Sequence, residues 1–396
     1  MWKGLFLSLP SESINSSLVP VMNGLANNGY EIIWYNNHAL KGNNSFKFKT
    51  YPAFDSGYDS PWIHSDSSYY RLTEVLMDTT IHLMDFLIAE VEREQPDFII
   101  YPHLSIWAKL IARYFKLPAI MCSTTFVMDQ RIMIPYFRKF RTATGAGTEK
   151  VDQAFNFLSK AKQLYKRLNI TERVDIWDAY INSGNLNLVL IPEEFQPDIN
   201  LLDESYKFIG FPTILPAKTS ERKLVYVSLG TILNVDTAFY NICIQAISSL
   251  QLEGIISLGK SLKKESLDPV GNEITLAESV DQNATLLEAA VFVTSGGMAS
   301  VSEAVAAKTP MIVIPQTTEQ KITAERIADL GLGVHLDRSA LTMPNLSERI
   351  LQLMNDPSYK EKITALSDEM SAMQVTDKTI KLISTYLDKE LKLNHT

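Results

Sequence analysis

Short apolar runs alternate with longer amphipathic segments along the first half of the chain. Runs at 3–9, 31–35, 98–101, 119–122 and 186–191 predict buried strands, and segments 17–28, 70–95 and 106–115 predict helices between them. Residues 129–180 follow a mostly helical, polar pattern. Strands that alternate with helices form a parallel sheet covered by helices on both faces.

The same rhythm restarts after a polar segment without periodicity at 216–222. Strands are predicted at 224–228, 254–257, 291–293 and 311–314, and helices at 237–250, 299–307, 322–330 and 377–391. A chain of 396 residues is too long for one ordinary core and fits about two. We therefore expect an α/β protein with two Rossmann-like, doubly wound parallel sheets, which bind ligands at the carboxyl ends of their strands.

Composition narrows the classes of function. The net charge of −8 argues against a nucleic-acid partner, because phosphate backbones require a basic surface. The two cysteines, Cys122 and Cys243, lie far apart in apolar surroundings, which is typical of buried thiols in a reducing compartment and indicates a cytoplasmic protein. No apolar run is long enough for a transmembrane segment, and no cluster has metal-ligand spacing.

Two glycine-containing turns follow predicted strands of the second half. Gly230 and Thr231 belong to the first turn, and Ser295, Gly296 and Gly297 belong to the second, which also opens a helix. Backbone N–H groups at such a turn and at a helix N-terminus can hold a pyrophosphate. A lone Gly-Gly after a strand is more often a tight turn, but two such turns in one doubly wound half favour a nucleotide site.

Two residues of the helix after the second turn fit the same interpretation. Ser300 falls in the first turn of the predicted helix, and Glu303 lies one turn further along. An acidic residue in this place suits the two hydroxyls of a ribose.

These features resemble the inverting family 1 glycosyltransferases, which include the UDP-glycosyltransferases and, as the nearest type, the bacterial macrolide glycosyltransferases. The resemblance is carried by the donor signature at 291–333 (VFVTSGGMASVSEAVAAKTPMIVIPQTTEQKITAERIADLGLG) and by segments 194–210, 225–234 and 25–32. It implies the GT-B fold, in which two Rossmann-like domains face a cleft. Residues 1–213 would bind the acceptor, residues 214–376 would bind the donor, and residues 377–396 would form a helix that returns to the first domain.

The resemblance also implies roles for single residues, with a nucleotide sugar as co-substrate and no cofactor or metal. Thr231 and Ser300 would contact the donor phosphates, with backbone donors from the second glycine turn, and Glu303 would hold the ribose. Gln282 would lie by the nucleobase. The pair Glu319-Gln320 matches the acidic residue and glutamine that contact sugar hydroxyls, although Glu319 also fits a solvated acid at a helix start.

The reacting centre departs from the family pattern. The family uses a histidine in the first loop as the base that deprotonates the acceptor, with an aspartate as its partner; here Ser13 and Pro102 stand at those positions. Ser295 replaces a second histidine, which serves the donor pyrophosphate, and Ala299 replaces an asparagine. Loss of a positioned base typically lowers the rate by about 10² to 10⁴.

Three accounts of this departure remain open. First, another side chain is the base: His103 or Glu12, each of which also fits an ordinary loop residue, or the weaker candidates His64 and Asp129. Second, the acceptor is acidic enough to need no strong base. Third, the chain is an inactive homologue that binds a ligand or supports an auxiliary protein partner. The expected function is inverting transfer of a sugar from a nucleotide-sugar of the UDP-sugar type to a small hydrophobic or natural-product acceptor.

Overall fold

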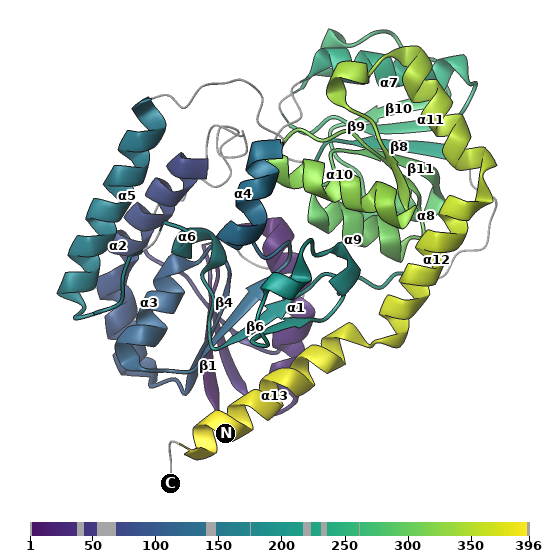
Figure 1. The fold of residues 1–396 in the computed structure, drawn as a ribbon. Helices are drawn as coiled ribbons and strands as arrows, with labels where there is room; N and C mark the ends of the chain where they lie inside the picture. Colours follow the sequence, from purple (N-terminus) through teal and green to yellow (C-terminus); the bar gives the residue numbers. More distant parts are fainter. Residues whose placement is uncertain are drawn as a thin grey trace. The chain divides into compact units, whose positions relative to one another are not determined.

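The computed structural model of the chain forms two compact units. It describes residues 2–37, 43–53, 69–139, 148–174, 176–216, 223–230, 236–260 and 262–393. The N-terminal unit combines residues up to 212 with the last segment from 374 onward, and the C-terminal unit spans residues 213–373 (Figure 1).

The N-terminal unit is built on a seven-stranded parallel sheet with the order β3-β2-β1-β4-β5-β6-β7. The strands are β1 (Lys3–Leu7), β2 (Glu31–Tyr35), β3 (Lys47–Lys49), β4 (Phe98–Pro102), β5 (Ala119–Ser123), β6 (Leu186–Val189) and β7 (Tyr206–Phe208). β1, β4 and β5 are almost entirely apolar because both of their faces are buried. The chain runs outward from β1 in both directions, which creates a switch point between β1 and β4.

Helices cover both faces of this sheet. They are α1 (Glu12–Asn27), α2 (Tyr69–Glu94), α3 (Ile106–Phe115), α4 (Gln130–Lys139), α5 (Thr148–Arg167) and α6 (Asp178–Ile181). In Figure 1, α2, α3 and α5 lie on one side of the sheet, and α1 lies on the other together with α13 (Val375–Leu393). Gly24 lets α1 approach α13, because a Cβ at this position would overlap the Ile380 side chain.

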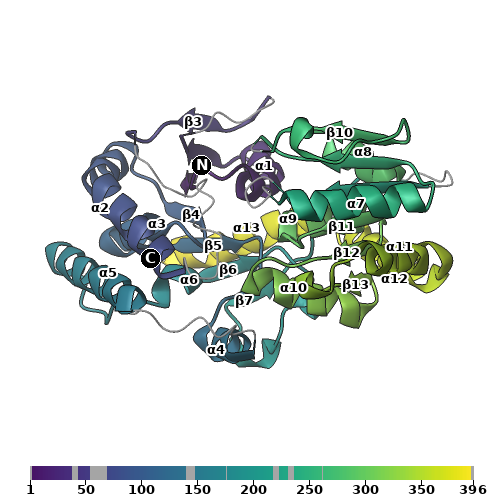
Figure 2. The same cartoon turned by 90° about the horizontal axis from the view of Figure 1, so that it is seen from above.

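The C-terminal unit has a six-stranded parallel sheet with the order β10-β9-β8-β11-β12-β13. Its strands are β8 (Leu224–Ser228), β9 (Gly254–Ser257), β10 (Ile274–Ala277), β11 (Ala289–Thr294), β12 (Met311–Val313) and β13 (Gly333–His335). Its helices are α7 (Thr237–Ser249), α8 (Gln282–Glu288), α9 (Met298–Ala306), α10 (Thr318–Leu330), α11 (Met343–Asn355) and α12 (Pro357–Ala372). Figure 2 shows the same elements from above. The predicted α/β class with two Rossmann-like parallel sheets is confirmed.

Several predicted boundaries are wrong for local reasons. The first helix begins at Glu12 rather than at 17, because Ser11 caps it by accepting a hydrogen bond from the Ile14 N–H. The helix predicted from 322 begins at Thr318, because Thr317 and Gln320 form a capping box. The short strands β3, β7, β10 and β13 and the helices α8, α11 and α12 were not predicted.

Two further observations concern the described residues only. None of their helices combines the length and apolar character needed to cross a membrane. They also hold no group of three or more His, Cys, Asp or Glu side chains placed to bind a metal ion.

Candidate functional site

The two glycine-containing turns of the C-terminal unit lie side by side at the carboxyl edge of its sheet. β8 and β11 are neighbours, with Ser228 paired to Thr294 at their ends. The Ser295 hydroxyl donates a hydrogen bond to the Leu229 carbonyl oxygen over 3.2 Å, which ties the second turn to the first. In the first turn, the Gly230 N–H donates to the Ser228 hydroxyl over 3.3 Å. Thr231, the predicted phosphate contact, lies outside the described residues.

The second turn requires glycine and leads into α9. Gly296 has a φ of +87°, and a Cβ there would lie 2.6 Å from Cγ1 of Val313. Gly297 precedes α9 and has no side chain to cap it, and no described atom lies within 4 Å of the place where its Cβ would stand. The first N–H groups of α9 therefore start beside open space, the arrangement that accommodates an anion.

Three predicted donor residues are joined by hydrogen bonds. The Gln282 side-chain amide donates to the Ser300 hydroxyl over 3.1 Å and to the Glu303 carboxylate. Tyr226, which was not predicted, donates its hydroxyl to Gln282 Oε1 over 3.1 Å. Burial raises the pKa of Glu303, the hydrogen bond from Gln282 opposes that rise, and the Asp281 charge adds to it.

The predicted sugar-contacting pair stands at the start of α10. Gln320 Oε1 accepts hydrogen bonds from the N–H groups of Gln316 and Thr317, at 2.8 Å and 3.3 Å. Its amide also lies 3.4 Å from the Ser295 hydroxyl, so it connects α10 to the second glycine turn. The cap of α10 is thus formed by Thr317 and Gln320, while Glu319 lies half-buried in the first helical turn.

His103 follows β4 at the carboxyl edge of the N-terminal sheet. Its backbone N–H donates to the Cys122 carbonyl oxygen over 3.1 Å, and only 6% of the residue is exposed. The alternative interpretation of His103 as an ordinary residue of a surface loop is therefore wrong. Its Nδ1 is buried and has no hydrogen-bond partner among the described residues. Burial lowers the pKa of His103 to about 4, so the imidazole is neutral at pH 7.

The start of α1 lies at the same edge of the sheet. Glu12 and Ser13 occupy its first turn rather than the predicted loop, and their side chains lie outside the described parts. Nearby, the Asn15 amide donates to the Leu9 carbonyl over 3.0 Å, while its buried Oδ1 has no partner among the described residues. The Asn36 amide, after β2, donates to the same carbonyl over 3.1 Å.

Neither Asn15 nor Asn36 was predicted, although Asn36 offered a signal as a polar residue directly after a buried strand. Of the two weaker base candidates, His64 lies outside the described residues. Asp129 is held by Arg131 through a 2.9 Å hydrogen bond, which lowers the pKa of the aspartate and explains it as a local ion pair.

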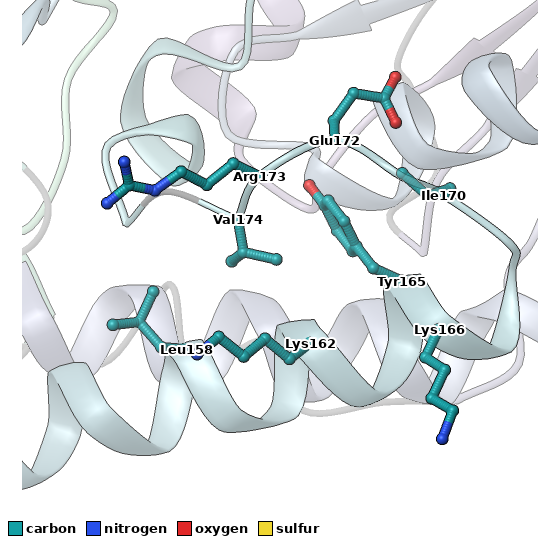
Figure 3. Close-up of a pocket in the computed structure, with 8 residues that line it drawn as sticks. All are labelled: Leu158, Lys162, Tyr165, Lys166, Ile170, Glu172, Arg173 and Val174. Atoms are coloured by element: carbon teal, nitrogen blue, oxygen red, sulfur yellow. The ribbon is translucent and has the colours of Figure 1, made fainter.

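A separate cavity of about 530 Å³ lies between α5 and the segment after it, in the N-terminal unit. Figure 3 shows Tyr165 rising from α5 toward residues 170–174, with the Lys166 side chain directed away. The cavity is lined by none of the predicted site residues.

Known proteins resemble this chain over nearly its full length. Residues 241–383 match the family model of the erythromycin biosynthesis protein CIII-like C-terminal domain. An uncharacterized UDP-glucosyltransferase, YojK of Bacillus subtilis, is 26% identical over 390 residues, which cover 93% of both chains. The oleandomycin glycosyltransferase of Streptomyces antibioticus is 26% identical over 305 residues, 74% of this chain and 68% of that one.

Together, these matches support the predicted resemblance to the family 1 glycosyltransferases. The fold agrees with this resemblance: the solved structure of the kitacinnamycin glycotransferase superposes with a TM-score of 0.80 at 23% identity, covering 97% of this chain and 98% of that one. The predicted GT-B fold and glycosyltransferase class are thereby confirmed. The replacement of the family's catalytic dyad by Ser13 and Pro102 stays a prediction from the resemblance.

Proposed function

We propose that this glycosyltransferase moves a sugar from a UDP-sugar to a small hydrophobic natural-product acceptor, with inversion at the anomeric carbon. The acceptor hydroxyl would attack that carbon, the bond from the carbon to the diphosphate oxygen would break, and the nucleoside diphosphate would leave. The acceptor proton would pass to a base on the N-terminal unit or to water. The name of YojK as a UDP-glucosyltransferase supports the UDP-sugar donor. The name of the Streptomyces relative as an oleandomycin glycosyltransferase supports the natural-product acceptor.

The observation that carries the proposal is the polar group at the carboxyl edge of the C-terminal sheet. Open space beside Gly297 adjoins the first turn of α9, where a diphosphate would accept backbone hydrogen bonds. Ser300 would add a hydroxyl to the same phosphates, and Gln282 would stand by the base. The Glu303 carboxylate, one helical turn beyond Ser300, would accept hydrogen bonds from the ribose.

The sugar would contact the start of α10. Glu319 would accept hydrogen bonds from sugar hydroxyls. Gln320 would contribute its amide, whose Nε2 is directed toward the second glycine turn through Ser295. Ser295 cannot supply the positive charge of a protonated histidine, so the backbone N–H groups would carry more of the diphosphate charge than in relatives that keep the histidine.

His103 is the best-placed candidate base among the described residues, although its burial weakens it. A pKa of about 4 leaves the ring neutral and able to accept a proton, but makes it a weaker base than a histidine near pKa 7. An acceptor such as a phenol, which ionises more readily than an alcohol, would reduce the demand on this ring. Glu12 remains the second candidate.

The same low pKa favours a second function: binding of a nucleotide sugar without turnover, in support of a partner protein. Calorimetric titration with UDP, dTDP and their sugars, combined with product detection over a panel of phenolic and alcoholic acceptors, separates the two functions. Binding with turnover supports the proposal, binding without turnover supports the second function, and absence of nucleotide binding refutes both.

The role of His103 has its own test. In an active enzyme, His103→Ala should lower kcat/KM by at least about tenfold, and His82→Ala, an exposed histidine of α2, should not. A loss below about tenfold for His103→Ala would exclude it as the base.

A further inference from the structure

A second cavity, with many polar residues in its wall, lies at the edge of the N-terminal sheet opposite His103. It has a volume of about 560 Å³ and is bordered by the beginnings of β5 and β6, the C-terminal end of α3 and one face of α13. Because the strands are parallel, their amino ends lie at the edge away from the carboxyl-end loops that hold His103 and Asn15. The cavity is therefore separate from the proposed acceptor region, and it also differs from the cavity of Figure 3, with which it shares only Glu172.

One face of α3 supplies positive charge to this cavity. Lys109 and Arg113, four residues apart, lie on one side of the helix, and Lys116 follows as its C-terminal cap in the left-handed conformation. Lys109 is only 6% exposed. Glu172 and Glu390 also line the cavity, so three cations face two carboxylates.

Hydrogen-bond donors at the wall are left unused. Arg113 Nη1 and the Tyr386 hydroxyl are buried and lack partners among the described residues. The hydroxyl of Tyr101, a fully buried residue, also lacks a described partner and lies 3.0 Å from where a Cβ on Gly184 would stand, at the cavity wall. Two of these donors line the cavity and the third lies beside the lining residue Gly184, whereas buried polar groups normally have hydrogen-bond partners.

The three donors also lie within electrostatic reach of one another. Burial raises the pKa of Tyr101, and the Arg113 charge opposes that rise, while the Tyr386 hydroxyl adds to it. Burial likewise raises the pKa of Tyr386, with the charge of Glu390 as a second cause. Both phenols therefore stay protonated at neutral pH and can donate hydrogen bonds.

We infer that this cavity binds a small hydroxylated organic anion, with a carboxylate or phosphate group against Arg113. A guanidinium fork and phenol hydroxyls are donors that suit the oxygens of such a group. Glu172 and Glu390 would accept hydrogen bonds from the hydroxyls of the ligand. The volume exceeds that of a bare phosphate and falls in the range of small-molecule sites. This inference is independent of the proposed sugar transfer.

Calorimetric titration of the full chain with glucose 6-phosphate and with citrate tests the inference, with inorganic phosphate and neutral glucose as comparisons. The titrations include saturating UDP, because the glycine turns of the C-terminal unit could also take an anion. We expect one of the two organic anions to bind more tightly than inorganic phosphate, and glucose not to bind. If glucose 6-phosphate binds more tightly than citrate, the natural ligand carries a phosphate group. If citrate binds more tightly, the natural ligand carries a carboxylate group.

Variants locate the binding. Arg113→Gln should weaken it by at least about tenfold, and Tyr386→Phe, which removes one hydroxyl and keeps the ring, by about three- to tenfold. Lys381→Gln changes an exposed cation of the same helix α13 and should leave the affinity within about twofold. If Arg113→Gln does not fold, the affinity of Tyr386→Phe alone shows whether the anion binds in this cavity.

Two results would overturn the inference. One is that neither organic anion binds the wild-type chain. The other is that the affinity stays within about twofold in both Arg113→Gln and Tyr386→Phe, which would place the anion outside this cavity.

Discussion

The buried histidine after β4 makes the stability of the protein depend on pH in a direction that can be worked out. The pKa of His103 is about 4 in the folded chain, against 6.5 for a solvated histidine, and burial is the cause. Between these two values the unfolded chain binds a proton that the folded chain does not. The contribution of His103 to stability is thus fully present above pH 6.5 and is lost as the pH falls toward 4. At 1.36 kcal/mol per pKa unit, the loss approaches roughly 3 kcal/mol.

The test replaces His103 with glutamine, which cannot be protonated in this range. Urea unfolding of the wild type and of His103→Gln is measured between about pH 7.5 and pH 4, and the two free energies of unfolding are subtracted at each pH. Other groups titrate alike in both proteins and cancel. We expect the wild type to lose about 3 kcal/mol relative to the variant over this range.

The matched control is His82→Gln, which replaces an exposed histidine and leaves the buried ring of His103 in place, so this variant should lose stability at low pH as the wild type does. A difference between the wild type and His103→Gln that stays constant within about 0.5 kcal/mol would refute a buried, neutral His103. The base assignment would then need revision as well, since a histidine with an ordinary pKa is better suited to accept the acceptor proton.

Three other expectations follow from single contacts. Gly296→Ala should destabilise the chain in urea by about 1 to 3 kcal/mol, because the new Cβ meets Val313 and the backbone φ is positive; unchanged stability would contradict the geometry of the turn. Leu387→Ala, at a fully buried position of α13, should cost about 2 to 5 kcal/mol, and a cost below about 1 kcal/mol would mean that α13 does not pack as described. Tyr226→Phe should weaken UDP binding by about three- to tenfold in calorimetry, since Gln282 loses its hydrogen bond, and an unchanged Kd would show that Tyr226 does not position Gln282.

The central strands and the glycine turns could be predicted from the sequence because their signals are local. β1, β4 and β8 are continuous apolar runs, and Gly296 and Gly297 directly follow such a run. The edge strands β3 and β13 were missed because they are only three residues long and half-exposed, so hydrophobicity does not mark them. Helix starts were misplaced where a single capping side chain, such as Ser11, determines the first turn.

The contacts of the candidate site depend on tertiary structure, so the sequence alone could not predict them. The bond from Tyr226 to Gln282 joins residues 56 positions apart, and Tyr226 in a strand resembles an ordinary core aromatic. The burial of His103 depends on how the loop after β4 packs, which no local pattern reports. The resemblance to a family supplied roles for Gln282 and Glu303, but only the structure brings them into one hydrogen-bonded group.

We expect the polar group around α9 to bind the nucleotide of the donor, and titration with UDP measures this directly. Calorimetry compares the wild type with Glu303→Gln and with Glu348→Gln, an exposed glutamate of α11 in the same unit. UDP should bind the wild type and Glu348→Gln equally. Glu303→Gln should bind UDP about 10- to 100-fold more weakly, because the ribose loses hydrogen bonds to a carboxylate. No UDP binding by the wild type, or equal binding by all three proteins, would contradict this expectation.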